Sequence, residues 1–250
     1  MDFEKVVKER SEIYDAHVHL GPSGQWLPYV NPEVDASTVI DAMDGAGIKR
    51  AIVFPNPAPG DRYPLYNDMI MDSVEAYPDR LMGFGRVDPR RGEEAIDEVH
   101  RCAERGLLGI KLHPFVETYR PDHPDFDPLF EAIYREDIII LTHTGPGFAS
   151  PGYMKKVLED REDLKIILGH LNEGCIPLSR NYENVYADTS GTRVYMLEYA
   201  CKHIPEKIVF GSDYPYLNYR VQKTVVDAAD ISNSLKESIF HSNLKRLLKG

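Results

Sequence analysis

The stretch Ile13-Tyr-Asp15-Ala-His17-Val-His19 sets a pattern that recurs along this chain, in which a short apolar run ends in residues able to bind a metal ion. Five further runs end in the same way, at Lys111-Leu-His113, Thr-His143, Gly-His170, Ala-Asp188 and Gly-Ser-Asp213. A (β/α)8 barrel builds its active site from the ends of many strands. The pattern therefore predicts a parallel barrel with a functional site where its strands end.

Eight strand-like runs alternate with helical patterns. The predicted strands are Ile13–His19, Ala51–Phe54, Leu81–Val87, Leu108–His113, Ile138–His143, Lys165–His170, Val185–Asp188 and Ile208–Asp213. Helical spacing of apolar residues predicts helices over Asp35–Gly45, Tyr66–Tyr77, Glu93–Arg105, Pro128–Glu136, Gly152–Asp160 and Arg193–His203. The interval from His170 to Val185 is shorter, so a single turn or an irregular helix is expected there. This alternation predicts a closed α/β barrel, with an open doubly wound sheet as the alternative.

Length and composition narrow the class of protein. A chain of 250 residues matches one barrel, and no linker or repeat divides it, so we expect one domain over residues 1–250. The formal net charge of −11 argues against nucleic acid or an anionic membrane as the main partner. Three cysteines without a C-x-x-C motif indicate a reducing compartment. With no apolar run long enough for a signal peptide or a membrane span, a cytoplasmic protein is expected.

Histidines at the predicted strand ends are the candidate metal ligands. Residues i and i+2 of a strand face the same side, so His17 and His19 can both point into the mouth of the barrel. A single H-x-H motif is weak evidence, because a buried histidine is more often part of the core. The joint pattern is stronger, since His143, His170 and Asp213 each end their own apolar run.

Taken in order, these motifs resemble the amidohydrolase superfamily, and most closely its branch of compact amidohydrolase-related proteins (amidohydrolase family 2). The similarity runs from residue 13 to 248 and includes Asn243-Leu-Lys-Arg246 near the end of the chain. The resemblance implies a distorted (β/α)8 TIM barrel with one or two divalent metals, most often zinc. Here one Zn²⁺ is the favoured expectation and two ions are the alternative.

The resemblance also implies roles for single residues. By position, His17, His19, His143 and Asp213 would bind the principal metal, and His170 would bind a second ion or act as an acid or base. Asp213 would also carry a proton between metal-activated water and the leaving group. Asp15 or Asp188 could orient a ligating imidazole through its second ring nitrogen.

Three further residues have two interpretations each. In binuclear members of the superfamily a carboxylated lysine bridges two metals, and Lys111 lies at that position; the favoured expectation is an unmodified Lys111 in contact with a carboxylate. His113 either meets the substrate or caps the loop that starts at Pro114. Arg86 either holds a substrate carboxylate or pairs with Asp88.

The expected activity is that of a metal-dependent hydrolase, which uses activated water to cleave an amide, lactone or ester in a small carbonyl-containing molecule. The alternative is non-oxidative decarboxylation of a small aromatic or unsaturated carboxylic acid, a lyase reaction of the same branch. The two share one ligand set, and the short chain favours hydrolysis. A non-catalytic metal-binding domain and a phosphoesterase or nuclease are further alternatives, and the acidic charge counts against a nuclease. Fold-level analogy adds homo-oligomerisation as an expectation.

Overall fold

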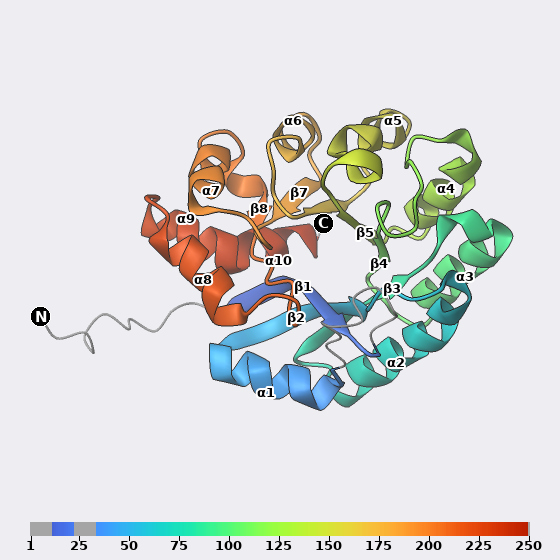
Figure 1. Cartoon of the computed structure of the whole chain (residues 1–250), viewed down its shortest axis with the longest axis horizontal. Coiled ribbons are helices and arrows are strands. Elements are labelled where there is room, and N and C mark those ends of the chain that lie inside the picture. Colours follow the sequence, from blue (N-terminus) through green and yellow to red (C-terminus); the bar gives the residue numbers. More distant parts are fainter. Residues whose placement is uncertain (1–11, 23–33, 250) are drawn as a thin grey trace, which may run out of the picture.

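The computed structural model describes residues 12–22 and 34–249, and these form a parallel barrel of eight strands (Figure 1). Each strand is hydrogen-bonded to the next in chain order, from β1 to β8. The strands are β1 (Ile13–Leu20), β2 (Ile48–Pro55), β3 (Leu81–Arg86), β4 (Gly109–Leu112), β5 (Ile139–His143), β6 (Ile166–Gly169), β7 (Val185–Asp188) and β8 (Ile208–Val209). The predicted (β/α)8 barrel is therefore confirmed.

The barrel closes through the segment that follows β8. We predicted a strand as far as Asp213, but β8 ends at Val209. Beyond it the chain turns to β1, where the amide of Ala16 donates to the carbonyl of Phe210 at 2.8 Å and the amide of Asp213 donates to the carbonyl of His17 at 2.8 Å. These bonds join the last strand to the first, which excludes the open sheet and holds Asp213 beside β1.

Helices surround the barrel in chain order (Figure 1). They are α1 (Ala36–Ala46), α2 (Tyr63–Ala76), α3 (Glu93–Glu104), α4 (Asp127–Arg135), α5 (Met154–Glu159), α6 (Cys175–Asn181), α7 (Val194–Cys201), α8 (Tyr219–Ala228), α9 (Asn233–Glu237) and α10 (Asn243–Leu247). Short 3-10 turns are η2 (Gly60–Arg62), η3 (Pro89–Arg91), η4 (Pro124–Phe126), η5 (Gly147–Ala149), η6 (Pro151–Tyr153) and η7 (Pro205–Lys207), and η8 (Ser238–Ser242) is a π turn. Within the described residues, no helix has the length and hydropathy that crossing a bilayer requires.

Local signals explain where these helices begin and end. Asp35 precedes α1 and accepts a hydrogen bond from the amide of Thr38 at 2.8 Å, which satisfies a free N–H of the first turn. The helix ends at Gly47, whose φ of 71° is a left-handed conformation that glycine adopts without strain. Between β6 and β7, where we expected a single turn or an irregular helix, the structure has α6, a regular helix of seven residues.

Two hydrophobic layers hold the barrel together. The inner layer consists of Tyr14, Ala16, Ile52, Phe54, Met82, Phe84, Ile139, Leu141, Ile167, Tyr186 and Val209, joined by Leu244 and Leu247. Those two leucines come from α10, so this C-terminal helix contributes to the inner core. The outer layer lies between the strands and the surrounding helices. Full burial of one such side chain contributes about 1.5–3 kcal/mol, so these layers supply most of the driving force for folding.

An irregularity in β1 decides where the first two histidines point. Tyr14 and Ala16 belong to the inner layer, whereas Val18 and Leu20 belong to the outer layer. Strict alternation cannot produce this arrangement, and the pairing of β1 with β2 indeed shifts register between Asp15 and Val18. The shift turns His17 and His19 to the inside of the barrel, where both rings contact Phe54.

Candidate metal centre and active site

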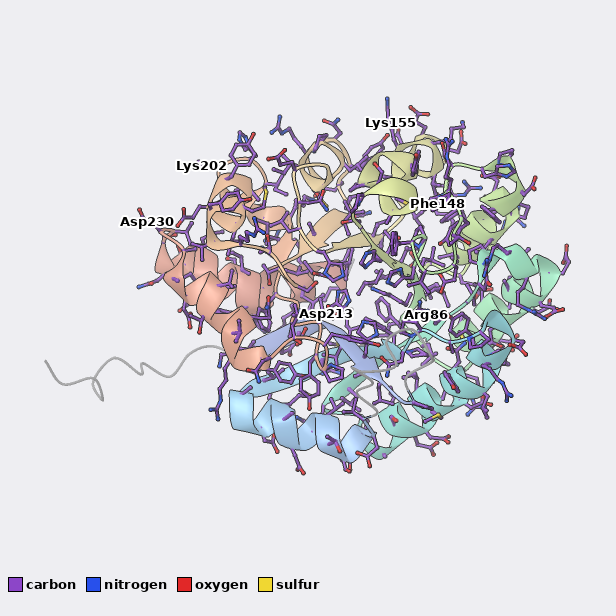
Figure 2. All side chains as sticks on the ribbon, in the orientation of Figure 1. Arg86, Phe148, Lys155, Lys202, Asp213 and Asp230 are labelled. Atoms are coloured by element: carbon purple, nitrogen blue, oxygen red, sulfur yellow. The ribbon has the colours of Figure 1, made fainter. Side chains whose placement is uncertain are left out.

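A compact group of two imidazoles and one carboxylate lies at the carboxyl end of β1. Nε2 of His19 is 3.1 Å and Nε2 of His17 is 3.4 Å from Oδ1 of Asp213. Among the described residues, these three form the group of His, Cys, Asp and Glu side chains close enough to share one metal ion. We call His17, His19 and Asp213 the metal group. In Figure 2, Asp213 and Arg86 lie toward the middle of the molecule, whereas Asp230 and Lys202 lie at its periphery.

The donor set of this group fits a divalent ion. Atoms bound at about 2.1 Å to one ion lie roughly 3.0–3.4 Å apart for octahedral or tetrahedral angles, which matches the two measured separations. Burial lowers the pKa of His17 to about 4 and that of His19 well below its ordinary value, so both rings are neutral and able to ligate. A cation between the Nε2 atoms and the carboxylate oxygen would stabilise this arrangement of donors.

Asp188, at the end of β7, orients His17. Its Oδ2 lies 2.7 Å from Nδ1 of His17, so that nitrogen carries the proton and donates it, and Nε2 keeps its lone pair. Burial acts to raise the pKa of Asp188, but the neighbouring His17 and its hydrogen bonds outweigh burial and hold that pKa well below the ordinary value. We predicted that Asp15 or Asp188 orients an imidazole through its second ring nitrogen. Asp188 does so, and Asp15 does not.

Asp15 instead joins the backbones of β1 and the segment after β8. Its Oδ1 accepts the amide of His17 at 2.9 Å and the amide of Ser212 at 3.0 Å. The side chain is completely buried, and this burial raises its pKa to about 7. Asp15 therefore fixes the backbone on both sides of the metal group and does not touch an imidazole ring.

Two strand ends place a non-glycine residue in the left-handed backbone region. The φ angle is 65° at His170 and 58° at Asp213. Such a conformation costs of order 1–3 kcal/mol at a non-glycine residue, and it concentrates at functional sites. Here it turns the backbone directly after β6 and after the β8 extension, where the two side chains enter the site.

His170 lies next to the metal group and shares a partner with it. Its ring centroid is 5.0 Å from that of His17. Nδ1 of His170 is 2.9 Å from Oγ of Ser190, and the same hydroxyl donates to Oδ1 of Asp188. Ser190 and Asp188 thus connect the two histidines through their Nδ1 atoms.

His143 and His113 extend the row of rings. The ring of His143 lies 4.5 Å from that of His170 in an edge-on contact, and His113 stacks on His143 at 3.9 Å. Burial lowers the pKa of both His113 and His143 well below the ordinary value. The structure therefore brings His143 beside His170, but not into the compact group of His17, His19 and Asp213.

Lys111 is buried at the centre of the site. Its Nζ lies 3.3 Å from Nε2 of His17 and 4.7 Å from the ring centroid of Phe54. Burial lowers its pKa to about 7, so its charge is only partly retained at neutral pH. We predicted contact with a carboxylate, but among the described residues the ammonium group is in hydrogen-bonding reach of an imidazole. Asp188, the carboxylate whose charge acts most strongly on Lys111, is engaged by His17 and Ser190.

Arg86 also has a partner that the sequence did not indicate. It is completely buried, and its Nη2 lies 2.8 Å from Oε1 of Glu117. The hydroxyl of Tyr63 donates to the same oxygen at 2.8 Å, and Oε2 accepts the amide of His113 at 3.0 Å. The predicted pairing with Asp88 is wrong, because Asp88 binds Arg90 at 2.6 Å. Substrate binding by Arg86 stays a prediction, and its neutralisation by Glu117 argues against it.

An open cavity of about 660 Å³ adjoins this row of histidines. It is formed by the loops after β5, β6 and β7, and its lining includes Thr144, His170, Asn172, Ser190, Arg193 and Tyr195. This volume lies within the range of roughly 300–1,000 Å³ that is typical of small-molecule sites. His170 and Ser190 belong both to the wall of the cavity and to the hydrogen-bonded network around His17.

Sequence reasoning missed Glu117, Tyr63 and the role of Ser190. Ser190 follows Asp188 by two residues, so the Asp-Thr-Ser motif at that strand end could have indicated it. Glu117 lies in a loop and has no pattern around it. Only the folded chain brings it to Arg86, 31 residues earlier in sequence.

An eight-stranded barrel with a His-His-Asp group at its strand ends defines the class: a TIM-barrel enzyme with a candidate site for a divalent metal. The chain belongs to the amidohydrolase family, since the family model described as amidohydrolase matches residues 14–250. This confirms the resemblance to the amidohydrolase family 2 branch.

One relative and two solved structures that resemble this chain are decarboxylases. The chain is 21% identical over 246 residues to gamma-resorcylate decarboxylase of Rhodococcus jostii (strain RHA1), which covers 73% of this chain and 75% of that protein. The structure of a 2,6-dihydroxybenzoate decarboxylase with 2,6-dihydroxybenzoate matches 96% of this chain and 100% of its own, with a TM-score of 0.80 and 19% identity. A 5-carboxyvanillate decarboxylase from Novosphingobium aromaticivorans, with manganese and 4-hydroxy-3-methoxy-5-nitrobenzoic acid, matches 96% of both chains, with a TM-score of 0.80 and 20% identity.

These comparisons correct the predicted activity. The prediction of a hydrolase is wrong, because the relative and the two solved structures named above are decarboxylases, and the alternative that we stated is the better supported one. The argument from length failed because this chain aligns with the whole of a decarboxylase structure. The ligand types could not discriminate, since both reactions use the same donors. Zinc is likewise not shown, and the metal in the similar structure is manganese.

Proposed function

We propose that this chain is a divalent-metal-dependent, non-oxidative decarboxylase of a small aromatic carboxylic acid, with residues 1–250 as one catalytic domain. The observation that carries the proposal is the position of His170. It lines the 660 Å³ cavity, and its ring centroid lies 5.0 Å from that of His17 in the metal group. An aromatic acid bound in the cavity would contact His170 and so lie beside the residues that would hold the ion. The decarboxylase relatives support the same reaction class.

His17, His19 and Asp213 are the residues that would hold the ion, and manganese is the metal we propose because a similar structure contains it. When bound, the ion supplies positive charge that attracts the acid's oxygens and stabilises negative charge developing on the substrate. Ligation by His143 stays a prediction, and carboxylation of Lys111 stays the alternative to the unmodified side chain that we expect. The unmodified Lys111 beside His17 adds positive charge to the same end of the barrel.

The reaction replaces a carboxylate by a proton. A proton adds to the ring carbon that carries the carboxylate, the bond from that carbon to the carboxylate breaks with its electron pair remaining on the ring, and CO2 leaves. Asp213 is the proposed proton donor. Its Oδ1 makes the contacts to His17 and His19, so Oδ2 is the oxygen free to pass a proton to the substrate. His170 is the second acid or base, at the cavity wall.

The test is a decarboxylation assay on metal-free protein reloaded with Mn²⁺. We expect CO2 release from 2,6-dihydroxybenzoate or 5-carboxyvanillate, and in D2O the product gains one deuterium at the vacated ring carbon. Asp213→Asn is expected to lower the rate by about 10²–10⁴, the usual contribution of general acid catalysis. The matched control is Asp230→Asn, an exposed aspartate at the periphery (Figure 2), which leaves the rate unchanged. Mn²⁺-loaded protein that decarboxylates no aromatic acid would refute the proposal.

A further inference from the structure

The hydrogen bonds of His170 define which of its ring nitrogens carries the proton. Nδ1 lies 3.2 Å from the backbone carbonyl oxygen of Ser190 and 2.9 Å from the Oγ atom of the same residue. A carbonyl oxygen can only accept a hydrogen bond, so Nδ1 must be the donor. In a neutral imidazole the proton on Nδ1 leaves a lone pair on Nε2.

The hydroxyl of Ser190 supports the same assignment. It donates to Oδ1 of Asp188, which also accepts the backbone amides of His170 at 3.1 Å and Ser190 at 2.9 Å. With its hydrogen committed to Asp188, Oγ can only accept from Nδ1 of His170. Ser190, completely buried, is therefore a positioning residue for His170.

His113 has the opposite arrangement. Its Nδ1 lies 3.3 Å from the backbone amide of Val116, and an amide N–H can only donate. Nδ1 of His113 is therefore the acceptor, and the proton is on Nε2. Two hydrogen bonds between His113 and Glu117 close the turn that places Val116. The backbone amide of Glu117 donates to the carbonyl of His113 at 3.0 Å, and the side-chain Oε2 of Glu117 accepts the amide of His113.

We propose that His113 and His170 are held in opposite tautomers, so that the two ends of the row His113–His143–His170 offer one N–H donor and one lone pair. The donor is Nε2 of His113, and in the neutral ring of His170 the lone pair is on Nε2. Ser190 and the turn at Val116 are the elements that impose the difference. Both assignments follow from backbone groups with a single hydrogen-bonding role.

The pair gives His113 a role in specificity, and this step rests on the proposed function. A donor at His113 is complementary to an anionic oxygen of the acid, whereas the lone pair at His170 would repel such an oxygen and accept a proton-bearing group. An acid that enters the cavity at His170 and extends along the contacting rings to His113 would meet a lone pair at one end and a donor at the other. Exchange of either tautomer would remove that polarity, because both rings would then donate or both would accept.

Long-range ¹H–¹⁵N correlation spectra of protein labelled with ¹⁵N-histidine test the tautomers directly. The protein is loaded with Zn²⁺, which is diamagnetic. Of the nine histidines, His113 and His170 are assigned by the peaks that disappear in His113→Gln and His170→Gln. We expect the Nε2–H pattern for His113 and the Nδ1–H pattern for His170. The same tautomer in both rings, or fast exchange between tautomers in either, overturns the proposal.

Ser190→Ala tests the positioning role by spectroscopy. Removing the nearer acceptor is expected to lower the ratio of Nδ1–H to Nε2–H tautomer at His170 by about two- to tenfold, the equivalent of one ordinary hydrogen bond. The matched control is Ser212→Ala, a second completely buried strand-end serine whose hydroxyl donates to the backbone carbonyl of His17. It is expected to leave the His170 pattern unchanged. An unchanged pattern in Ser190→Ala would remove Ser190 from the proposal.

Calorimetric titration with 2,6-dihydroxybenzoate tests His113 as a donor. His113→Leu is expected to weaken binding about tenfold or more, whereas His113→Gln, which keeps an N–H at the same reach, stays within about threefold of wild type. Equal losses in both variants contradict the donor role. If the wild-type protein binds no aromatic acid, the proposed function fails, and the spectra still decide the tautomers independently.

Discussion

Replacing Asp188 by asparagine should weaken metal binding without touching a metal ligand. Oδ1 of Asp188 accepts two backbone amides, from His170 and Ser190, so the amide oxygen of an asparagine would take that position. Its NH2 group would then face Nδ1 of His17, where Oδ2 now lies at 2.7 Å. A donor at that place forces Nδ1 to accept, which moves the proton of His17 to Nε2.

The proton on Nε2 would occupy the lone pair that points toward Asp213. Loss of such an orienting partner costs about 10–100-fold in metal affinity, which corresponds to about 1.4–2.7 kcal/mol. The assay is calorimetric titration of Mn²⁺ into metal-free protein at fixed pH, together with a urea unfolding curve that establishes a folded variant. The matched control is Asp15→Asn, a buried aspartate that accepts two backbone amides but touches no ring. We expect its affinity within about threefold of wild type.

A folded Asp188→Asn protein that binds Mn²⁺ as tightly as wild type would refute the reasoning. That result would mean that the ion does not use Nε2 of His17, or that Asp188 does not set its tautomer. An equally large loss in Asp15→Asn would also count against it, because the effect would then follow from altering any buried carboxylate near β1 and not from the orientation of one imidazole.

Three other perturbations have defined outcomes. His17→Ala should remove turnover and most bound metal, and an active variant with full metal content by elemental analysis would contradict the site. Glu117→Gln leaves the charge of Arg86 buried without a counter-charge, so urea unfolding should show a loss of about 3–5 kcal/mol; a loss below 1 kcal/mol would contradict the buried pair. Lys111→Met should stabilise metal-free protein at pH 7 and below, and a pH-independent difference from wild type would contradict a lowered lysine pKa.

The sign of the lysine effect follows from linkage. The pKa of Lys111 is about 7 in the folded chain and about 10.5 when exposed, so between these values the unfolded chain binds more protons. Wild-type stability therefore rises with pH across this window because of Lys111, by at most about 1.4 kcal/mol per pH unit. The advantage of Lys111→Met is largest at pH 7 and below, and it disappears by about pH 10.5.

The strand ends show how far sequence reasoning reaches into the site. The alternation of apolar runs and helices predicted the barrel, and the residue types at the strand ends predicted His17, His19 and Asp213 as candidate ligands, which the structure places together. The same logic also selected His143, which instead stacks on His113 and lies outside that group. Position at a strand end sets the neighbourhood of a side chain, but not which way its ring nitrogens face.

Other features depend on contacts between distant segments. The register shift in β1 leaves no mark in a sequence that reads as an ordinary alternating strand, yet it turns His17 and His19 inward. Strand β8 ends at Val209, and residues 210–213 bond to β1, a partner nearly 200 residues away in sequence. Glu117 neutralises Arg86 from a loop whose own sequence is uninformative.

The sequence by itself determined the class of fold and the chemical types at the strand ends, because apolar periodicity is a local property that burial translates directly into strands and helices. Tertiary structure alone decided which donors meet, which tautomer the hydrogen bonds of His17, His113 and His170 favour, and which carboxylate is free for chemistry. Those outcomes depend on hydrogen bonds such as Asp188 to His17 and Val116 to His113, and their geometry exists only after the barrel has closed.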